Sequence, residues 1–509
     1  MFTLLKTCLF VLQVTLVART TCLTFSPNSS LPQINITLTP YLNGENPVLH
    51  GKIVLEIDVA NNETLVQLPT TLAGQPSARY TNKTLNASDS SGPLVLKVFD
   101  DPNGAEGQPT RLWNTERKTQ GLITVEFTAE PRYVKEDELM GPLFDIRANG
   151  KGLIGSSWAL LPLPPISTAE FQYTLNWDLK QSPNGTDAVW TWGEGSQPPV
   201  ISGSKEDVLY TYWAVGNLSS YPSEGTHPLS PKFGMYWLQE PSFNVTATAT
   251  FIDKFFNYSS TFWHDDGTQP YRVFIRHNDN AGTGGTALTR SFTFGWHDDT
   301  VTQDYLDLLL AHEITHNWPH INDKASAPVT RYAEGTAEYY SLRLVWRNEQ
   351  ITTARYLKEM NDRLQAYYTN PVVNLTDDQA YDQAWELRSA QRIPYGRGLI
   401  YLINVDAHIR KRSKGKHNLD SLTLELQDTC IKTPANCTEA FLLKLLTKYV
   451  GSNAVKEYHQ VAKGGKSVIR PVANSLGPCF DVVKTNSTPP VFQWRAKKGK
   501  DIESKACFI

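Results

Sequence analysis

The chain has 509 residues, of which 40% are hydrophobic and 11% aromatic, and its formal net charge is -3. A chain of this length and composition can build two or three domains with substantial cores, which indicates a large globular protein. The small net charge argues against a polyanionic partner. The basic run at residues 408–417 is interpreted as the end of a helix, where the helix dipole stabilises cations, so no nucleic acid partner is expected.

Residues 1–22 are predicted to be a signal peptide. Lys6 precedes an apolar run over residues 9–18, and this run is too short to span a bilayer. Thr20 and Cys22 meet the small-residue requirement for cleavage after Cys22. We therefore expect a secreted, extracellular protein with no stable membrane insertion after signal cleavage. An uncleaved membrane anchor is the alternative.

Residues 23–205 are predicted to form an N-terminal, all-β domain that resembles a β-sandwich. Apolar and polar residues alternate at 34–38, 52–59 and 122–127, with the period of two that is typical of half-buried strands. Clusters of Pro, Gly, Asn and Ser, which favour turns, lie between such runs. A stretch rich in Pro, Gly and Ser at about 181–205 marks the expected domain boundary.

Residues 206–470 are predicted to form a second domain that combines a small sheet with a helical bundle. We expect a helix near 247–262, a strand at 271–277 and mostly helices from residue 303 to about residue 449. Residues 471–509 contain Pro and Lys without a clear period and are expected to form an irregular C-terminal tail. The predicted fold class is therefore α+β, with more than one domain.

The segment His312-Glu313-x-x-His316 is a candidate metal-binding motif. Positions i and i+4 share one face of a helix, so the two imidazoles can converge on one ion while Glu313 points toward an open coordination position. The apolar run at 305–311 indicates a mostly buried helix that would hold this face rigid. A chance match on a core helix is the alternative.

Glu334 is the predicted third metal ligand. Pro319 and Pro328 indicate that the chain turns after the first helix, and residues 331–342 have the pattern of a second helix. Two His and one Glu, with a water in the fourth position, make a common ligand set of catalytic zinc sites. Glu338 lies one turn further along the same face, where it can accept the ring N–H of a ligand histidine. A solvated surface carboxylate is the alternative for Glu338.

These residues predict a zinc-dependent metallopeptidase with one Zn²⁺ per chain and peptides as its substrates. Zinc in such a site polarises the scissile carbonyl and makes water acidic enough to lose a proton near neutral pH. Glu313 is expected to be the general base that takes this proton and passes it to the leaving amine. A catalytically silent binding protein is the alternative from another class.

Three motifs carry a resemblance to a known family. They are His312-Glu313-x-x-His316-x-Trp318, Glu334-Gly335-Thr336-Ala337-Glu338-Tyr339-Tyr340 and Pro394-Tyr395-Gly396-Arg397-Gly398, with a weaker match at 412–420. By these motifs the chain resembles the gluzincin metallopeptidases and, within them, the glycyl aminopeptidase family. The resemblance extends from the β-rich first third of the chain to about residue 450.

The resemblance implies a thermolysin-like catalytic domain. It implies that Tyr395 stabilises the oxyanion of the tetrahedral intermediate, and that Arg397, which replaces a lysine of the family and keeps its charge, contacts the substrate. Bacterial members of the family often end in a peptide-binding PDZ domain. The stretch after residue 470 is too short to contain one, so this chain is expected to lack it.

One element departs from the family pattern. Family members carry a Gly-Gly-x-Glu element on an edge strand before the zinc helix, and its Glu holds the free amino terminus of the substrate. The corresponding stretch is 282–288, where Ala287 stands in the place of the acid. Gly284 and Gly285 are predicted to bind the substrate backbone by β-augmentation. A simple hairpin loop is the alternative for these glycines.

The missing acid leaves two modes of cleavage open. A carboxylate that pairs with a substrate ammonium contributes about 1.5–3 kcal/mol, so its loss weakens selectivity for free amino termini. Aminopeptidase-like activity is the leading hypothesis, and a thermolysin-like endopeptidase is the alternative. The sequence makes no prediction about the oligomeric state.

Cysteines and glycosylation sequons agree with a secreted protein. Two disulfides are predicted, one between Cys430 and Cys437 across a short turn and one between Cys479 and Cys507 that clamps the tail. The two other cysteines leave with the signal peptide. The Asn-x-Ser/Thr sequons lie at Asn28, Asn35, Asn62, Asn82, Asn86, Asn184, Asn217, Asn244, Asn257, Asn374, Asn436 and Asn486.

Overall fold

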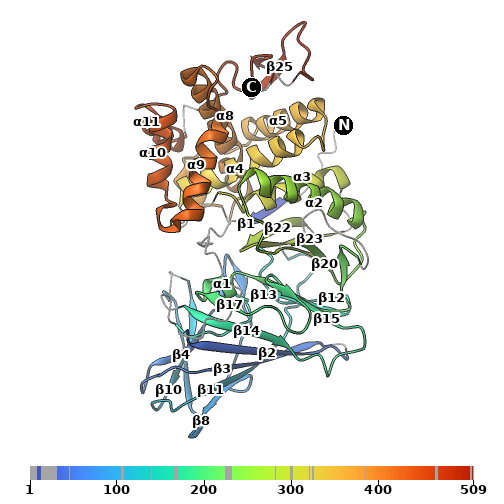
Figure 1. Cartoon of the computed structure of the whole chain (residues 1–509), viewed down its shortest axis with the longest axis vertical. Helices are drawn as coiled ribbons and strands as arrows, with labels where there is room; N and C mark the ends of the chain where they lie inside the picture. The colour runs from blue at the N-terminus through green and yellow to red at the C-terminus, as the bar shows by residue number, and fades with distance from the viewer. Residues whose placement is uncertain are drawn as a thin grey trace. The chain divides into compact units, whose positions relative to one another are not determined.

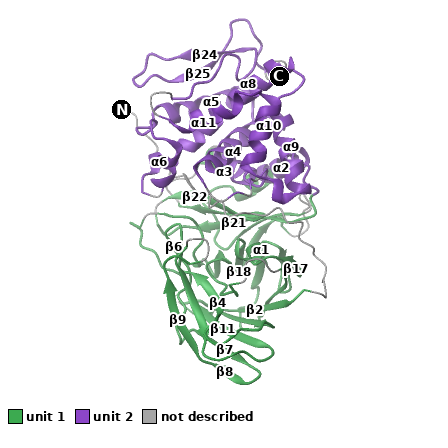
Figure 2. Cartoon of the chain, turned by 90° about the vertical axis from the view of Figure 1, so that its left-hand side faces the viewer, with its two compact units in different colours: residues 1–12, 21–250, 267–306 green, residues 13–20, 251–266, 307–509 purple. Residues whose placement is uncertain are grey.

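The structure is a computed structural model of the whole chain (Figure 1). The residues that it describes are 9–12, 31–44, 46–104, 108–138, 140–165, 170–223, 232–280, 282–297, 302–319, 321, 323, 326–384, 386–464, 468–504 and 507. The chain divides into two compact units (Figure 2), unit 1 with residues 1–12, 21–250 and 267–306, and unit 2 with residues 13–20, 251–266 and 307–509. The predicted boundary at residue 205 therefore falls inside unit 1.

Unit 1 contains a seven-stranded sheet in the order β17-β14-β2-β3-β11-β7-β8. Its strands are β2 (Gln33–Tyr41), β3 (Val48–Leu55), β7 (Leu85–Asp89), β8 (Gly92–Leu94), β11 (Ile123–Ala129), β14 (Phe171–Trp177) and β17 (Ile201–Gly203). The sheet is mixed, because β2 pairs parallel with β14 and antiparallel with β3. Burial alternates along β2 and β11, so one face of the sheet is packed inward, as the period of two predicts.

Smaller sheets complete this part of unit 1. A five-stranded sheet contains β12 (Arg147–Asn149), β13 (Gly152–Ser156), β18 (Tyr212–Gly216), β15 (Asp187–Trp190) and β16 (Gly193–Glu194), and short helix α1 (Glu206–Leu209) precedes β18. The others contain β4 (Thr64–Pro69), β10 (Thr110–Thr115) and β9 (Leu96–Asp101), and the pair β5 (Thr71–Leu72) and β6 (Gln75–Pro76). Trp113, Trp190 and Trp213 are fully buried, so large aromatic side chains fill much of the space around these strands.

A six-stranded sheet in the order β1-β22-β23-β21-β20-β19 follows in unit 1. Its strands are β1 (Leu9–Leu12), β19 (Ser219–Tyr221), β20 (Phe233–Trp237), β21 (Tyr271–His277), β22 (Thr283–Leu288) and β23 (Ser291–Trp296). The strand predicted at 271–277 is confirmed as β21. Gly284 and Gly285 lie inside β22, so the alternative that they form a hairpin loop is wrong.

Strand β1 pairs in parallel with β22, with Phe10 opposite Gly284 and Val11 opposite Gly285. On its other side β22 pairs antiparallel with β23. Residues 9–12 belong to the predicted signal peptide, and the remainder of that segment lies outside the described residues. The edge of β22 opposite β23 is thus paired with residues 9–12 of the same chain.

Unit 2 is mainly helical. It contains most of α2 (Val245–Phe262) and of α3 (Gln303–Thr315), whose first residues belong to unit 1. Its other helices are α4 (Ala327–Arg347), α5 (Thr353–Tyr368), α6 (Asp377–Asp382), α7 (Arg388–Gln391), α8 (Ile393–Ser413), α9 (Leu419–Lys432), the 3₁₀ turn η2 (Pro434–Asn436), α10 (Glu439–Tyr449) and α11 (Ala454–Ala462). The helix predicted near 247–262 and the helical region predicted from residue 303 to about 449 are confirmed.

Helices α4 and α8 approach each other closely at two glycines. A Cβ atom on Gly335 of α4 would lie 2.5 Å from the carbonyl carbon of Gly398, and one on Gly398 of α8 would lie 2.3 Å from the carbonyl oxygen of Arg331. Both distances are far below a van der Waals contact, so only glycine allows the two backbones to come this close. The start of α4 is fixed by Ser326, whose side chain accepts a hydrogen bond from the Val329 N–H.

The C-terminal tail contains a β-hairpin, so the expectation of an irregular tail is wrong. Strands β24 (Phe480–Lys484) and β25 (Phe492–Ala496) pair antiparallel. The Asn361 side chain on α5 donates to the Trp494 carbonyl at 2.9 Å and accepts from the Trp494 N–H at 2.8 Å, so β25 is attached to α5. The predicted disulfides Cys430–Cys437 and Cys479–Cys507 are both formed, and the second clamps this hairpin.

The close approach of α4 and α8 generates a prediction for stability. Gly335→Ala forces the two helices apart, and we expect it to lower the free energy of unfolding by about 1–3 kcal/mol, the usual cost of overpacking. Gln365→Ala, at an exposed position of α5, is the control and should change stability by less than about 0.5 kcal/mol. Urea unfolding followed by circular dichroism measures both. Equal stability of the two variants would contradict the proposed packing.

Candidate metal centre

Helix α3 and the residue after it carry the two predicted histidine ligands. Their ring centroids are 4.8 Å apart, and the two Nε2 atoms face each other at 3.2 Å. His312 is 2% exposed and His316 is 7% exposed, and the leucines at 308–310 that precede them are buried as well. The helical spacing of four residues therefore brings both imidazoles to one buried point.

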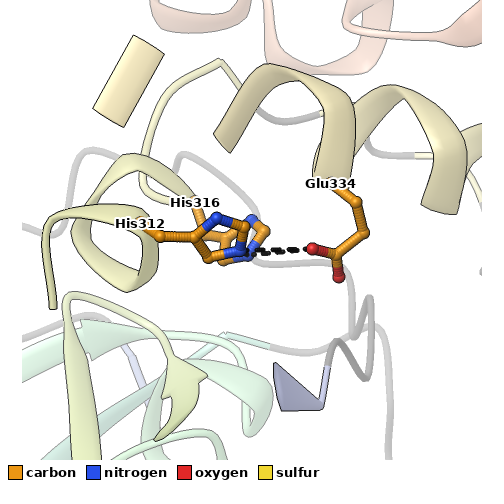
Figure 3. A group of neighbouring side chains, drawn as sticks. All are labelled: His312, His316 and Glu334. Atoms are coloured by element: carbon orange, nitrogen blue, oxygen red, sulfur yellow. Dashed lines mark hydrogen bonds and ion pairs between the residues drawn. The ribbon is translucent and has the colours of Figure 1, made fainter. Parts of the chain in front are cut away.

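Glu334 completes the group from helix α4. Its Oε2 atom lies 3.3 Å from Nε2 of His312 and 3.7 Å from Nε2 of His316 (Figure 3). In Figure 3 the two imidazole rings overlap in the view, and the Glu334 carboxylate points toward them from α4. In the described part of the chain, these three residues form the one group of His, Cys, Asp and Glu that could hold a metal ion.

The separation of the three ligand atoms fits a tetrahedral zinc ion. Bonds of about 2.0–2.1 Å in a tetrahedral arrangement place neighbouring ligand atoms about 3.3 Å apart. The distances of 3.2, 3.3 and 3.7 Å agree with this value. In addition, Oε2 of Glu334 is buried without a hydrogen-bond donor, although it faces two ring nitrogens. The donor set therefore suits zinc in both chemistry and spacing.

The electrostatics of the group favour a bound cation. Burial alone would lower the pKa of His312, but the carboxylates of Glu334 and Glu338 outweigh burial and raise it to about 10. Burial raises the pKa of Glu334, while the contact with His312 and the charge of that ring act in the opposite direction. A positive charge between these groups is thus strongly stabilised, and a metal dication supplies such a charge.

Glu313, the predicted base, is fully buried beside the ligands. Neither of its carboxylate oxygens has a hydrogen-bond partner among the described residues. Its pKa is raised to about 8, mainly by burial; the positive charge of His312 opposes this rise and the charge of Glu334 adds to it. A buried carboxyl group with a raised pKa and no protein hydrogen-bond partner is suited to exchange protons with water or a substrate.

Glu338 contacts a ligand histidine from one turn further along α4. Its Oε1 atom lies 3.3 Å from Nδ1 of His312, and its Oε2 atom is bound by Arg363 of α5. Burial would raise the pKa of Glu338, but the charge of Arg363 and the hydrogen bond from His312 hold it below its ordinary value. Because Glu338 is 7% exposed, the alternative of a solvated carboxylate is wrong.

Tyr395 reaches the group from the first turn of α8. Its ring stacks on the ring of His312, with centroids 5.6 Å apart and planes within 7° of parallel. Burial raises the pKa of Tyr395 far above its ordinary value, so its hydroxyl keeps its proton and can act as a donor. The guanidinium of Arg392, just before α8, lies 4.8 Å from the Tyr395 ring centre.

Arg397 lies in the interior and not beside the metal ligands. It is 1% exposed and donates to Asp377 at 2.6 Å and to the carbonyl oxygen of Leu375 at 2.6 Å. Arg331 of α4 donates to the same Asp377 at 2.7 Å. These contacts tie α4, α6 and α8 together, and they give the predicted contact of Arg397 with a substrate no support.

Two arginines lie near the candidate metal centre although the sequence patterns did not predict a role for them there. Arg363 binds Glu338 from α5, and the charge of Arg392 lowers the pKa values of Glu313 and Glu334, in both cases after the larger effect of burial. A pair of charges at positions 359 and 363 was the one local signal for Arg363, and such i,i+4 pairs are common on solvent-facing helices.

The predicted peptide-binding glycines lie in a strand, and the glycosylation sequons are spread over the surface. Gly284 and Gly285 belong to β22 of unit 1.

Asn28 lies outside the described residues, and the other sequon asparagines are all exposed, except Asn35, which is partly exposed. All described sequons are thus accessible to modification. No helix in the described residues has the length and apolar character required to cross a membrane.

Comparisons with known proteins show the fold. No protein-family model matches the chain, and no curated protein sequence matches it significantly. Solved structures match along most of its length. An aminopeptidase N family protein from Idiomarina loihiensis has 15% sequence identity and a TM-score of 0.64, and the match covers 89% of this chain and 79% of that one.

Two further structures match similarly. An M1 zinc metallopeptidase from Deinococcus radiodurans has 13% identity and a TM-score of 0.53, with 87% of this chain and 96% of that chain covered. Native yeast LTA4 hydrolase has 12% identity and a TM-score of 0.52, with 89% of this chain and 70% of that chain covered. The chain therefore has a multidomain fold of sheets and helices similar to that of M1 zinc metallopeptidases.

The metal centre generates a prediction for zinc content. Because three buried ligand atoms are already spaced for one ion, we expect purified protein to contain close to one zinc per chain, and His316→Ala to lose it. His264→Ala is the matched control, since His264 is exposed and pairs with Asp428. Elemental analysis by mass spectrometry measures the content. Full zinc occupancy in His316→Ala would contradict the ligand assignment.

Proposed function

We propose that the protein is a zinc-dependent metallopeptidase that hydrolyses peptide bonds, with aminopeptidase-like activity. The observation that carries this proposal is the group of His312, His316 and Glu334, spaced for one tetrahedral ion, with the unpaired carboxylate of Glu313 beside it. The likeness in fold to M1 zinc metallopeptidases supports it. A silent binding protein is less favoured, because the ligands, a base and a tyrosine are all present.

His312, His316 and Glu334 hold the zinc ion in this proposal. When bound, zinc supplies Lewis acidity, which polarises the scissile carbonyl and makes a water molecule acidic near neutral pH. Glu338 lies 3.3 Å from Nδ1 of His312, and this contact orients the ring so that its Nε2 is directed at the ion. The ring of Tyr395, which stacks on the His312 imidazole, restricts the rotation of that imidazole out of its present plane.

Glu313 is the proposed general base. It takes a proton from the attacking water and later returns that proton to the leaving amine, so the carboxyl group must titrate near the working pH. Burial, which raises its pKa to about 8, acts in that direction, and a bound dication would lower the value toward neutrality. Among the described residues no group forms a hydrogen bond with either oxygen of Glu313, so neither oxygen is committed to another protein group.

Tyr395 is the proposed donor to the oxyanion of the tetrahedral intermediate. Its position at the start of α8, stacked on a ligand ring, holds the side chain at the centre. Its raised pKa keeps the hydroxyl protonated. Removal of an oxyanion donor of this kind costs about 2.7–4 kcal/mol of transition-state stabilisation.

Extended peptides are the proposed substrates, bound at their backbone by Gly284 and Gly285. The pairing of residues 9–12 with these glycines supports the view that this edge of β22 takes an extended chain. Ala287 in place of the family acid favours a second candidate, a thermolysin-like endopeptidase that does not require a free amino terminus. An M1 zinc metallopeptidase mutant from Deinococcus radiodurans has been solved with a bound Tyr-Ser-Ala substrate, which agrees with a peptide ligand for this fold.

We also propose that the mature protein is a secreted glycoprotein. The apolar N-terminal run, the two disulfides and the exposure of the described sequons all support an oxidising, extracellular compartment.

Mass-spectrometric mapping of products from a peptide library tests the proposed function. The protein is incubated with the library as purified, with a chelator, and with zinc restored. Stepwise trimming from the amino terminus that stops with the chelator and returns with zinc supports an aminopeptidase. Internal cleavage under the same control supports the endopeptidase, and no cleavage in the zinc-loaded sample would contradict both.

The assigned roles of Glu313 and Tyr395 generate a kinetic prediction. Glu313→Gln should keep zinc and the fold but lose most turnover, because it removes a base and not a ligand. Tyr395→Phe should lower kcat with little change in KM, because the hydroxyl acts in the transition state. Glu349→Gln and Tyr381→Phe, at exposed positions, are the matched controls. Unchanged turnover of either site variant would rule out the role given to that residue.

The identity of residue 287 generates a prediction for substrate choice. Without an acid at Ala287, N-acetylation of a good peptide substrate should change kcat/KM by less than about tenfold, which corresponds to about 1.4 kcal/mol. Ala287→Glu should raise the preference for free amino termini, because it adds an anion that can pair with an ammonium group. A strict requirement of the wild-type protein for a free amine would show that another carboxylate does this task.

A further inference from the structure

A continuous line of side chains leads from the metal centre to helix α5. His312 contacts Glu338 at 3.3 Å, Glu338 is bound by Arg363, and Arg363 also contacts the Glu359 carboxylate at 3.1 Å. The line therefore crosses three helices, from α3 through α4 to α5. Its inner end is a predicted zinc ligand, and its outer end is an acid one turn before Arg363 on α5.

Arg363 is held by more than one contact. Its Nε atom donates to Glu338, and its Nη1 atom donates to the carboxylate and to the backbone carbonyl of Glu359, the latter at 3.2 Å. Only 21% of its side chain is exposed. A guanidinium presents its donors in a rigid, planar fork, so it can bind two carboxylates in fixed directions, whereas a lysine offers a single point charge.

Helix α5 is itself fixed in place near this arginine. Met360 and Leu364, which flank Arg363, are fully buried. Asn361 forms two hydrogen bonds with the backbone of Trp494 in the C-terminal hairpin. Since these neighbours leave α5 little freedom to shift, the guanidinium stays at a constant distance from Glu338.

We propose that Arg363 is a positioning residue for the zinc ion. Through its ion pair it holds the Glu338 carboxylate against Nδ1 of His312, and this contact directs Nε2 of His312 at the ion. The inference rests on the proposed function, because it presumes that His312 is a zinc ligand. Outer partners of ligand histidines generally alter metal affinity by about 10–100-fold when they are removed.

Zinc affinity of the full-length protein, measured by competition with a chelator, tests this role. Arg363→Met should raise the Kd for zinc by about 10–100-fold, because the Glu338 carboxylate is then free to turn away from His312. Lys358→Met is the matched control, since Lys358 forms an ion pair of the same i,i+4 type on α5 but is mostly exposed. The control should leave the Kd unchanged, and thermal unfolding of the zinc-free proteins shows whether either variant is folded.

A double-mutant cycle separates positioning from a general effect on structure. If Arg363 acts through Glu338, then Arg363→Met adds no further loss of zinc affinity in a Glu338→Gln background. Multiplication of the two losses, or a Kd within twofold of wild type for Arg363→Met, would overturn the proposal. If Arg363→Met does not fold, Arg363→Lys replaces it in the same cycle. For the lysine variant we expect a loss of about two- to tenfold, and an unchanged Kd would overturn the proposal.

The same titration distinguishes this inference from the proposed function. Tight zinc binding by the wild type together with unaffected Arg363 variants would reject only the positioning role. Failure of the wild-type protein to bind zinc at all would reject both. Tight binding by the wild type, with a loss in Arg363→Met that disappears in the Glu338→Gln background, would support both.

Discussion

The close approach of α4 and α8 is the constraint on which the metal centre depends. Gly335 and Gly398 allow the two backbones to touch, since a Cβ on either residue would lie within 2.5 Å of the opposite backbone. Glu334 directly precedes the first of these glycines, and Tyr395 lies one turn before the second. The contact therefore sets the positions of the proposed metal ligand Glu334 and of the proposed oxyanion donor at the same time.

The centre concentrates negative charge in the interior, and this charge requires compensation. Glu313, Glu334 and Glu338 are all buried within a short distance of His312. Burial of carboxylates without counter-charges is strongly unfavourable. Arg363 provides a counter-charge for Glu338 from α5, and the remaining two carboxylates lie where a zinc ion would offset them. Arg363 on α5 and the proposed zinc ion thus have complementary electrostatic roles.

Local patterns in the sequence predicted most of the features that involve residues close together in the chain. The strand at 271–277 and the spacing of the histidines followed from periodicity, and Glu334 followed from the order of two helices. Features that depend on tertiary packing were missed or misassigned. Arg363 reaches the centre from a separate helix, and Arg397 points into the bundle because Asp377 and two carbonyl oxygens bind it there. Charge alone does not show which helix face packs inward.

The ligand assignment is tested most directly by anomalous diffraction from crystals of the zinc-loaded protein, with data collected above and below the zinc absorption edge. We expect one strong zinc peak, bonded to Nε2 of His312, Nε2 of His316 and a carboxylate oxygen of Glu334, each at about 2.0–2.2 Å. A zinc peak held by other residues, with none between these three side chains, would contradict it.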